Sequence, residues 1–237
     1  MIFDQANFNI RCEWGRKGVS LLAPISDVII IVDVLSFSTA VEIATRQGAV
    51  VFPYQWKDHS VHDFASSVAA EVADKTNKHG YKLSPASLQS LPSDARLVLP
   101  SPNGAELSLA TGATPTLAGC LRNARAIAAS AMRRGKNIAV IPAGEKWEDG
   151  TLRPCVEDLV GAGAIIAQLR GTLSPEAGTA LAVFRDAGAE LTTLLRECVS
   201  GQEKIARGES LDVALAAEIN VSSCVPLLQA GAYRKEK

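Results

Sequence analysis

The chain has 237 residues, and its 24 basic and 25 acidic side chains leave a formal net charge of −1. It has neither a basic surplus nor a block of like charge, which argues against a nucleic-acid partner. Hydrophobic residues make up 47% of the sequence, enough to bury the core of one large α/β domain, and we predict a single domain over residues 1–237.

Apolar runs and cysteine usage indicate the compartment. The longest apolar runs are too short to span a bilayer, and the N-terminal segment lacks the apolar core of a signal peptide. Five cysteines lie far apart without a C-x-x-C pair, which is typical of reduced thiols and argues against structural zinc. We therefore expect a cytoplasmic protein with no membrane partner, and a homodimer as the default for an enzyme of this size.

The first two thirds of the chain repeat one pattern, in which a β-rich apolar run leads into a helix-length segment. Such units are expected within residues 28–48, 95–112, 115–135 and 136–150, with further strands within 8–14 and 49–54 and a helix over 154–171. The apolar runs do not alternate with polar residues, as is typical of strands covered on both faces. The pattern predicts an α/β fold with a mostly parallel sheet flanked by helices on both faces.

The remaining segments give weaker signals. Residues 57–78 are polar and alanine-rich, which favours a surface helix, and the serines and prolines of residues 83–95 favour a loop. Two helices are expected near residues 175–197 and 211–218, and residues 222–231 are left open as a strand or a loop.

Polar side chains follow several of the predicted strands, where the ligands of parallel sheets bind. These residues are Asp33, Ser36, Ser38 and Thr39 after the first unit's strand, Ser101, Asn103 and Gly104 after the second, Arg122, Asn123 and Arg125 after the third, and Gly144 and Glu145 after the fourth, with Glu157 and Asp158 opening the next helix. Hydroxyls and free N–H groups at helix starts attract anions, and glycine lets the backbone approach a ligand.

Asp33 follows five consecutive aliphatic residues, and burying its carboxylate is costly unless it is hydrogen-bonded or bound to a metal. The carboxylates at the strand ends are hard oxygen ligands of the kind that Mg²⁺ prefers, since it takes one or two of them together with water and substrate phosphate. All three histidines fall within or just beyond the predicted surface helix, which argues against a phosphohistidine mechanism.

Each of these residues also has a plain structural interpretation. Asp33 or Ser38 can cap a helix, and Asn103 and Gly104 can form an ordinary turn. For Arg122 and Arg125 we favour solvated charges over ligand contacts. The functional interpretation depends on all four strand ends being polar in the same way.

Five motifs, in order between residues 27 and 168, carry a resemblance: VDVLSFSTAVEIA, LPSPNGAELS, CLRNARAIA, VIPAGEKW and RPCVEDLVGAGAII. In these motifs the chain resembles the 2-phosphosulfolactate phosphatases of coenzyme M biosynthesis, the ComB-like family. The resemblance implies a Mg²⁺-dependent phosphatase of α/β fold that hydrolyses a small anionic phosphate monoester, 2-phosphosulfolactate, to sulfolactate and phosphate.

The resemblance also implies roles for residues that match its motifs. They are Asp33, Asn103 and Glu145 as catalytic residues, Ser36, Ser38, Ser101, Gly104, Asn123 and Arg153 as substrate-binding residues, and Asp33, Glu145, Glu157 and Asp158 as Mg²⁺ ligands. Many members have an arginine directly after the DVL sequence, where this chain has Ser36. Serine cannot form the bidentate contacts of arginine, so a different small phospho acid stays open as the substrate.

Other functions are weighed against this one. A catalytically silent, anion-binding homologue is the alternative outside enzymes, although clustered carboxylates without a metal suit an anion poorly. A dinucleotide-dependent oxidoreductase lacks a G-x-G-x-x-G motif, and the small residues of 161–164 favour close packing of a helix on the sheet. Direct attack by water is favoured over an aspartyl-phosphate, because Leu35 occupies the second position of the D-x-D pair that the best-known aspartyl-phosphate enzymes use.

Overall fold

The computed structural model describes residues 2–55, 58–73 and 81–236. Within these residues one large sheet has nine strands, and its pairing is parallel except around a C-terminal hairpin. In spatial order the strands are β1 (Ile10–Cys12), β7 (Ile138–Pro142), β2 (Val28–Val32), β6 (Thr116–Gly119), β10 (Pro226–Gln229), β11 (Ala232–Lys235), β3 (Val50–Tyr54), β5 (Arg96–Pro100) and β4 (Glu71–Val72). The predicted α/β fold with a mostly parallel sheet is confirmed.

Strand β2 lies at the centre of the parallel block β1-β7-β2-β6. Its last residue, Val32, pairs with Gly119 on β6 and with Pro142 on β7, so these three strands end level with one another. The residues that follow them, Asp33 and Ala143 among them, therefore start from the same edge of the sheet. All five residues of β2 are buried, as a strand covered on both faces requires.

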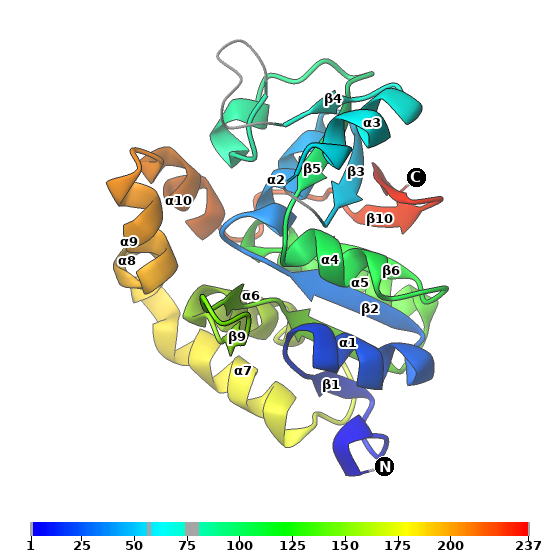
Figure 1. Ribbon diagram of the computed structural model, residues 1–237. Coiled ribbons are helices and arrows are strands. Elements are labelled where there is room, and N and C mark those ends of the chain that lie inside the picture. Colours follow the sequence, from blue (N-terminus) through cyan, green and yellow to red (C-terminus); the bar gives the residue numbers. More distant parts are fainter. Residues whose placement is uncertain (1, 56–57, 74–80, 237) are drawn as a thin grey trace.

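Helices cover both faces of the sheet, as predicted, and Figure 1 shows α1 and α4 together over one of them. The helices are α1 (Gly15–Leu22), α2 (Phe37–Arg46), α3 (Ser60–Ser67), α4 (Gly104–Leu109), α5 (Ala124–Arg134), α6 (Val156–Ile166), α7 (Pro175–Ala187), α8 (Leu191–Glu197), α9 (Val199–Ala206) and α10 (Ser210–Ala217). Because side chains alternate along a strand, Ile29 and Ile31 of β2 pack with α1 and α4, whereas Ile30 packs with α5 and α6.

The small residues of α6 allow close packing on both sides of that helix. A Cβ atom on Gly161 would lie 2.6 Å from Val34, and one on Gly163 would lie 2.1 Å from the carbonyl oxygen of Ala180 on α7. Residues 161–164 therefore pack a helix rather than bind a nucleotide, which confirms that prediction.

Several segment boundaries differ from the predictions. Within the predicted surface helix 57–78, α3 ends at Ser67 and β4 follows it, while positions 57 and 74–78 lie outside the described residues. The helix predicted near residues 175–197 is divided into α7 and α8 at Gly188, which adopts a positive φ angle, and the helix predicted near 211–218 is α10. Helix α9, between extended Cys198 and Gly208, was not predicted. The segment left open as strand or loop contributes β10, and most of residues 83–95 form the expected loop around a short 3-10 helix, Pro85–Leu88.

Among the described residues, no helix combines the length and apolar character needed to cross a bilayer. The single domain, the cytoplasmic location and the homodimer stay predictions.

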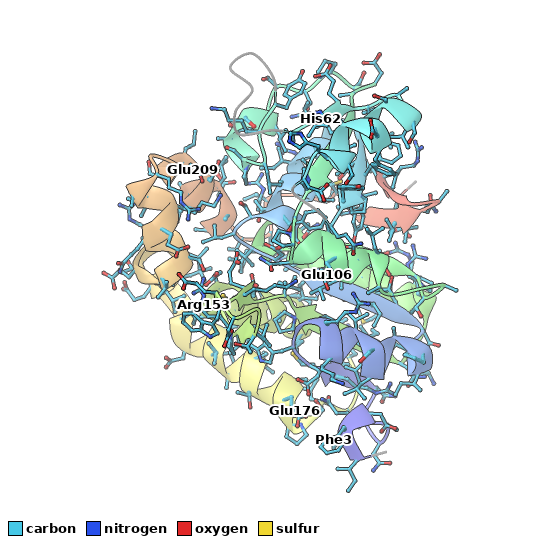
Figure 2. The ribbon with its side chains drawn as sticks, in the orientation of Figure 1. Phe3, His62, Glu106, Arg153, Glu176 and Glu209 are labelled. Carbon is cyan, nitrogen blue, oxygen red and sulfur yellow. The ribbon has the colours of Figure 1, made fainter. Side chains whose placement is uncertain are left out.

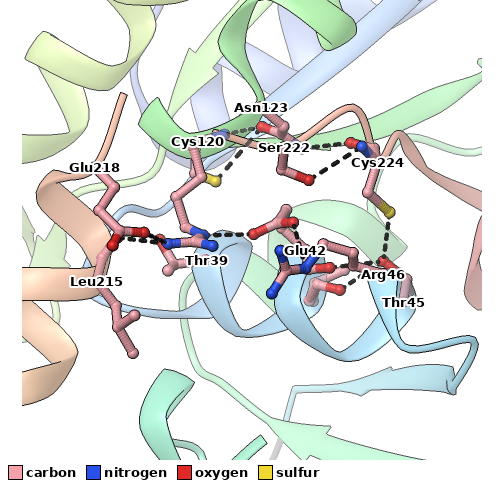
Figure 3. Close-up of polar contacts among 12 residues, drawn as sticks. Thr39, Glu42, Thr45, Arg46, Cys120, Asn123, Leu215, Glu218, Ser222 and Cys224 are labelled. Atoms are coloured by element: carbon pink, nitrogen blue, oxygen red, sulfur yellow. Dashed lines mark hydrogen bonds and ion pairs between the residues drawn. The ribbon is translucent and has the colours of Figure 1, made fainter. Parts of the chain in front are cut away.

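Arg122, expected to be a solvated charge, is 2% exposed, and that prediction is wrong. Its Nε atom donates to Glu42 Oε2 at 2.7 Å, and its Nη1 atom donates to the carbonyl oxygen of Leu215 and contacts Glu218 (Figure 3). A guanidinium is stable in the interior only when such acceptors compensate its charge. This ion pair ties α2 to the segment after β6 and to α10.

Replacing Arg122 with methionine should lower the free energy of unfolding by about 3–5 kcal/mol, because it leaves the Glu42 carboxylate buried without its partner. Urea denaturation measures the change. The matched control is Arg133→Met, which removes an exposed arginine paired with Glu236 and should cost at most about 1 kcal/mol. Equal effects of the two substitutions would contradict a structural role for the buried pair.

Candidate active site

Asp33 directly follows β2 and is 6% exposed. Its Oδ1 atom accepts a hydrogen bond from the backbone N–H of Phe37 at 3.0 Å, and Oδ2 accepts one from the N–H of Gly104 at 2.9 Å. These donors are the first residues of α2 and α4, whose N–H groups lack partners within their own helices. The carboxylate after the apolar strand is therefore hydrogen-bonded, and it joins two helix starts that lie 67 positions apart in the sequence.

Asp158, in the first turn of α6, makes a parallel set of contacts. Its Oδ1 atom accepts from the N–H of Val34 at 2.7 Å, and its Oδ2 atom accepts from the N–H of Gly144 at 2.8 Å. Asp158 therefore joins the end of β2 to the segment after β7. Together the two aspartates hold three of the four predicted strand ends around one point.

The burial of these aspartates changes their acidity. Burial raises the pKa of Asp33 from the usual 3.8 to about 6; the N–H bonds from Phe37 and Gly104 oppose the shift, and the nearby charges of Glu145 and Glu157 add to it. Burial also raises the pKa of Asp158 well above its usual value, with further contributions from Glu157 and Asp33. The cluster favours a bound proton or cation near these side chains.

A cavity of about 100 Å³ lies next to Asp33. The β2–α2 connection contributes Asp33 and Ser36, and the β5–α4 connection contributes Ser101 and Asn103. Glu145 completes this side from β8 (Glu145–Lys146), the first strand of a small hairpin with β9 (Leu152–Arg153). The structure thus brings five of the predicted site residues to one cavity, and Gly104 contacts Asp33 at its edge.

The remaining wall comes from α9, which the sequence analysis did not include in the site. Ser200, Glu203, Lys204 and Arg207 line the cavity from this helix and its C-terminal end. The spacing of Ser200, Lys204 and Arg207, at i, i+4 and i+7, places them on one helix face, and that was the signal available in the sequence.

Two residues that the resemblance implies as substrate-binding have their hydrogen-bond partners within the fold. The Ser38 hydroxyl accepts from the N–H of Asp33 at 3.0 Å and donates to the carbonyl oxygen of Ile31 at 3.1 Å, so it stabilises the turn after β2. Asn123 is fully buried; its amide nitrogen donates to the carbonyl oxygens of Ala118 and Cys224, and its oxygen accepts from the N–H of Cys120 (Figure 3). Both side chains use their hydrogen-bonding capacity within the fold, away from the cavity.

Arg153 lies beside the site rather than in its wall. Its guanidinium packs 5.6 Å from the centre of the Trp147 ring and donates to the Ser200 hydroxyl at 3.4 Å (Figure 2). His62 is exposed on α3, away from this region, and His79 lies outside the described residues (Figure 2).

The four predicted Mg²⁺ ligands do not form one ligand set. Among the residues that the structure describes, no group of three or more His, Cys, Asp or Glu side chains is arranged to hold a metal ion. Glu157 and Asp158 do not line the cavity. Asp33 and Glu145 do line it, and two carboxylates suit Mg²⁺, which fills its remaining positions with water and phosphate.

A parallel α/β sheet with carboxylates, hydroxyls and an amide around a small cavity at its strand ends defines an α/β protein built to bind a small polar ligand. The family model of 2-phosphosulpholactate phosphatase matches residues 19–231, and the chain belongs to this family. The prediction of a phosphoric monoester hydrolase acting on a small phosphorylated substrate is thereby confirmed. A search of the curated proteins found no match.

Gly104→Ala should damage the site. A Cβ atom there would lie 2.3 Å from Phe37 Cδ1 and 2.8 Å from Asp33 Oδ2, so the ring and the carboxylate must both move. We expect a loss of about 1–3 kcal/mol in the free energy of unfolding, as overpacking causes, together with impaired phosphate release. Denaturant titration and a phosphate-release assay measure the two effects.

The control is Gly178→Ala on α7, where no atom lies within 4 Å of the added Cβ and helix propensity favours alanine by up to about 1 kcal/mol. If Gly104→Ala behaved like this control, the close approach of α4 to Asp33 would be refuted.

In the metal-free protein, the Asp33 carboxyl should titrate with a pKa well above its usual 3.8. Because its pKa is about 6 when folded and near the usual 3.8 when unfolded, the folded chain holds an extra proton between these values. Its contribution to stability is complete below pH 4 and is lost as the pH rises through 6. Carboxyl ¹³C NMR titration in EDTA measures this pKa.

Asp149 is the internal reference, because hydrogen bonds from Thr151 lower its pKa below 3.8. Titration of both aspartates below 3.8 would contradict the buried, acidic environment assigned to Asp33.

Proposed function

We propose that the protein is a Mg²⁺-dependent phosphatase that hydrolyses a small anionic phosphate monoester, with 2-phosphosulfolactate as the first substrate to test. One observation carries this proposal: a cavity of about 100 Å³ is lined by the carboxylates of Asp33 and Glu145 on one side, and by Lys204, Arg207 and a further carboxylate, Glu203, on another. Membership of the phosphatase family supports the reaction class. The volume lies below the roughly 300–1,000 Å³ of sites for drug-sized ligands, which favours a small metabolite.

Asp33 and Glu145 are the residues that would hold Mg²⁺. When bound, the ion would neutralise charge on the phosphoryl oxygens and orient a water molecule. Its charge would also offset the burial and the neighbouring carboxylate charges that raise the pKa of Asp33. The N–H groups of Phe37 and Gly104 fix the Asp33 carboxylate, so that it does not need to reorganise when the substrate arrives.

The hydroxyls of Ser36 and Ser101 line the same cavity and are suited to donate hydrogen bonds to phosphoryl oxygens. The oxygen of a water molecule attacks phosphorus, the ester P–O bond breaks, and the alcohol and phosphate leave with the two protons of that water. A carboxylate that does not hold the ion would take up one proton of the attacking water and pass it to the leaving alcohol oxygen; half-buried Glu145 is our candidate where Asp33 alone holds the ion.

Direct attack by water is favoured over an aspartyl-phosphate intermediate. Both oxygens of Asp33 accept a backbone hydrogen bond, which reduces their nucleophilicity. The position two residues after Asp33 is Leu35, which cannot protonate a leaving group.

Phosphate release should depend on Mg²⁺ and on both carboxylates. We expect Asp33→Asn and Glu145→Gln each to lower kcat/KM by about 100-fold or more, since each removes a metal ligand or a proton acceptor. The assay measures phosphate released from a panel of small phospho acids that includes 2-phosphosulfolactate, with and without Mg²⁺. Asp63→Asn, an exposed position on α3, is the control and should retain full activity.

Circular dichroism and thermal melting establish that each variant is folded. Turnover without Mg²⁺ that survives both substitutions would reject the proposed metal site. A folded wild-type protein that releases no phosphate from any ester would instead favour the silent, anion-binding homologue.

A further inference from the structure

The cavity has an uneven charge distribution. The walls after β2 and on β8 contribute the carboxylates of Asp33 and Glu145, whereas both cationic groups, Lys204 and Arg207, come from α9 and its C-terminal end, together with one carboxylate, Glu203. Figure 1 shows α8, α9 and α10 (orange and brown) grouped together at one side of the sheet. A ligand in this cavity therefore meets two different electrostatic environments.

Lys204 is a buried cation that two carboxylates hold in place. The residue is 8% exposed, and its ammonium lies 2.8 Å from Glu209 Oε2 and 3.9 Å from Asp212 Oδ2. Glu209 is in the turn between α9 and α10 (Figure 2). An ammonium has three N–H donors, and of these two carboxylates only that of Glu209 is within hydrogen-bonding distance. Lys204 thus keeps donors for an acceptor in the cavity.

Asp212, the second carboxylate near Lys204, is buried, with only 1% exposure. Its Oδ1 atom accepts from the Ser84 hydroxyl at 2.7 Å and from the N–H of Ala86 at 2.9 Å. In the described part of the chain, its Oδ2 atom is buried without a hydrogen-bond partner and faces Lys204. A buried carboxylate oxygen left in this state is costly, and here its charge attracts the ammonium.

Arg207 completes the cationic wall at the rim of the cavity. Its side chain is 55% exposed, and it pairs with Glu203 at 4.0 Å, a contact that contributes little at an exposed position. The planar guanidinium can therefore turn to a carboxylate or sulfonate and bind two of its oxygens.

We propose that Lys204 and Arg207 bind the acid group that accompanies the phosphate ester in the substrate, and that Asp212 is a positioning residue for Lys204. This inference rests on the proposed phosphatase function. The carboxylate wall, with Mg²⁺, serves the phosphoryl group. The carboxylate wall would repel a second anionic group of the substrate, whereas the cations of Lys204 and Arg207 would attract it.

The test compares two substrates that differ in this acid group, 2-phosphosulfolactate and isopropyl phosphate, which has none. Arg207→Gln and Lys204→Met should each lower kcat/KM for 2-phosphosulfolactate by about 10- to 100-fold, the equivalent of one hydrogen bond to a charged group. Turnover of isopropyl phosphate should change less than about threefold. Lys204→Arg should retain most of the preference. Equal losses on both substrates would overturn the proposal.

Asp212→Asn tests positioning. The amide oxygen can still accept from Ser84 and Ala86, so the loop stays in place while the charge near Lys204 is removed. We expect KM for 2-phosphosulfolactate to rise several-fold, with kcat and the isopropyl phosphate reaction little changed. A loss confined to kcat would contradict this role. The matched control for Arg207→Gln is Arg133→Gln, which changes an exposed arginine on α5 that pairs with Glu236.

A binding measurement separates this inference from the proposed function. Calorimetry with sulfolactate, which has no phosphate, should show about tenfold or greater weakening in Lys204→Met and Arg207→Gln and retention in Lys204→Arg. If no phosphate ester is hydrolysed but the variants weaken sulfolactate binding in this way, the proposed phosphatase function is wrong. The assignment of Lys204 and Arg207 as acid-binding residues is then still supported. If sulfolactate binds all variants equally, or does not bind the wild type, the assignment is overturned.

Discussion

Two buried carboxylates, Asp33 and Asp158, hold the site together. Each accepts two backbone N–H groups, at least one of them from a segment distant in the sequence, at distances of 2.7–3.0 Å. Through these four hydrogen bonds the end of β2 is fixed to the start of α2, the start of α4 and the segment after β7. The positions of Ser36, Asn103 and Glu145 in the cavity wall all depend on this arrangement.

The same arrangement has an electrostatic consequence. Burial and neighbouring carboxylates raise the pKa values of both aspartates, so in the metal-free protein the ionised cluster is unfavourable. Such perturbed groups at the strand ends of an α/β sheet are typical of functional sites. Under the proposed function, a divalent cation would relieve this repulsion, and an anionic ligand would meet the cations of the α9 wall. Binding of metal and substrate is thus expected to be mutually supportive.

The sequence predicted those parts of the site that depend on local pattern. Asp33, Ser101, Asn103 and Glu145 each follow a strand whose apolar run is unmistakable, and the rule that ligands bind at strand ends located them. Ser38 and Asn123 stand in the same pattern, but their side chains turn back to the local backbone. Whether a hydroxyl or amide faces the cavity or its own turn depends on side-chain geometry, which a single sequence does not contain.

Contacts between residues far apart in the sequence could not be predicted, for the same reason. Arg122 is buried because Glu42, 80 positions earlier, lies beside it, and nothing near either residue indicates the partner. Helix α9 lies between the two helices predicted near residues 175–197 and 211–218, and breaks at Cys198 and Gly208 separate it from its neighbours. The spacing that places Lys204 and Arg207 on one helix face can be read from the sequence. The cavity that this face lines cannot.

The most direct measurement is a crystal structure with Mg²⁺, inorganic phosphate and sulfolactate bound together. We predict the ion on Asp33 and Glu145, phosphate between it and the hydroxyls of Ser36 and Ser101, and the acid groups of sulfolactate against Lys204 and Arg207. Phosphate bound to α9 with no metal at Asp33, or ligands outside this cavity, would contradict the assignment of the two walls.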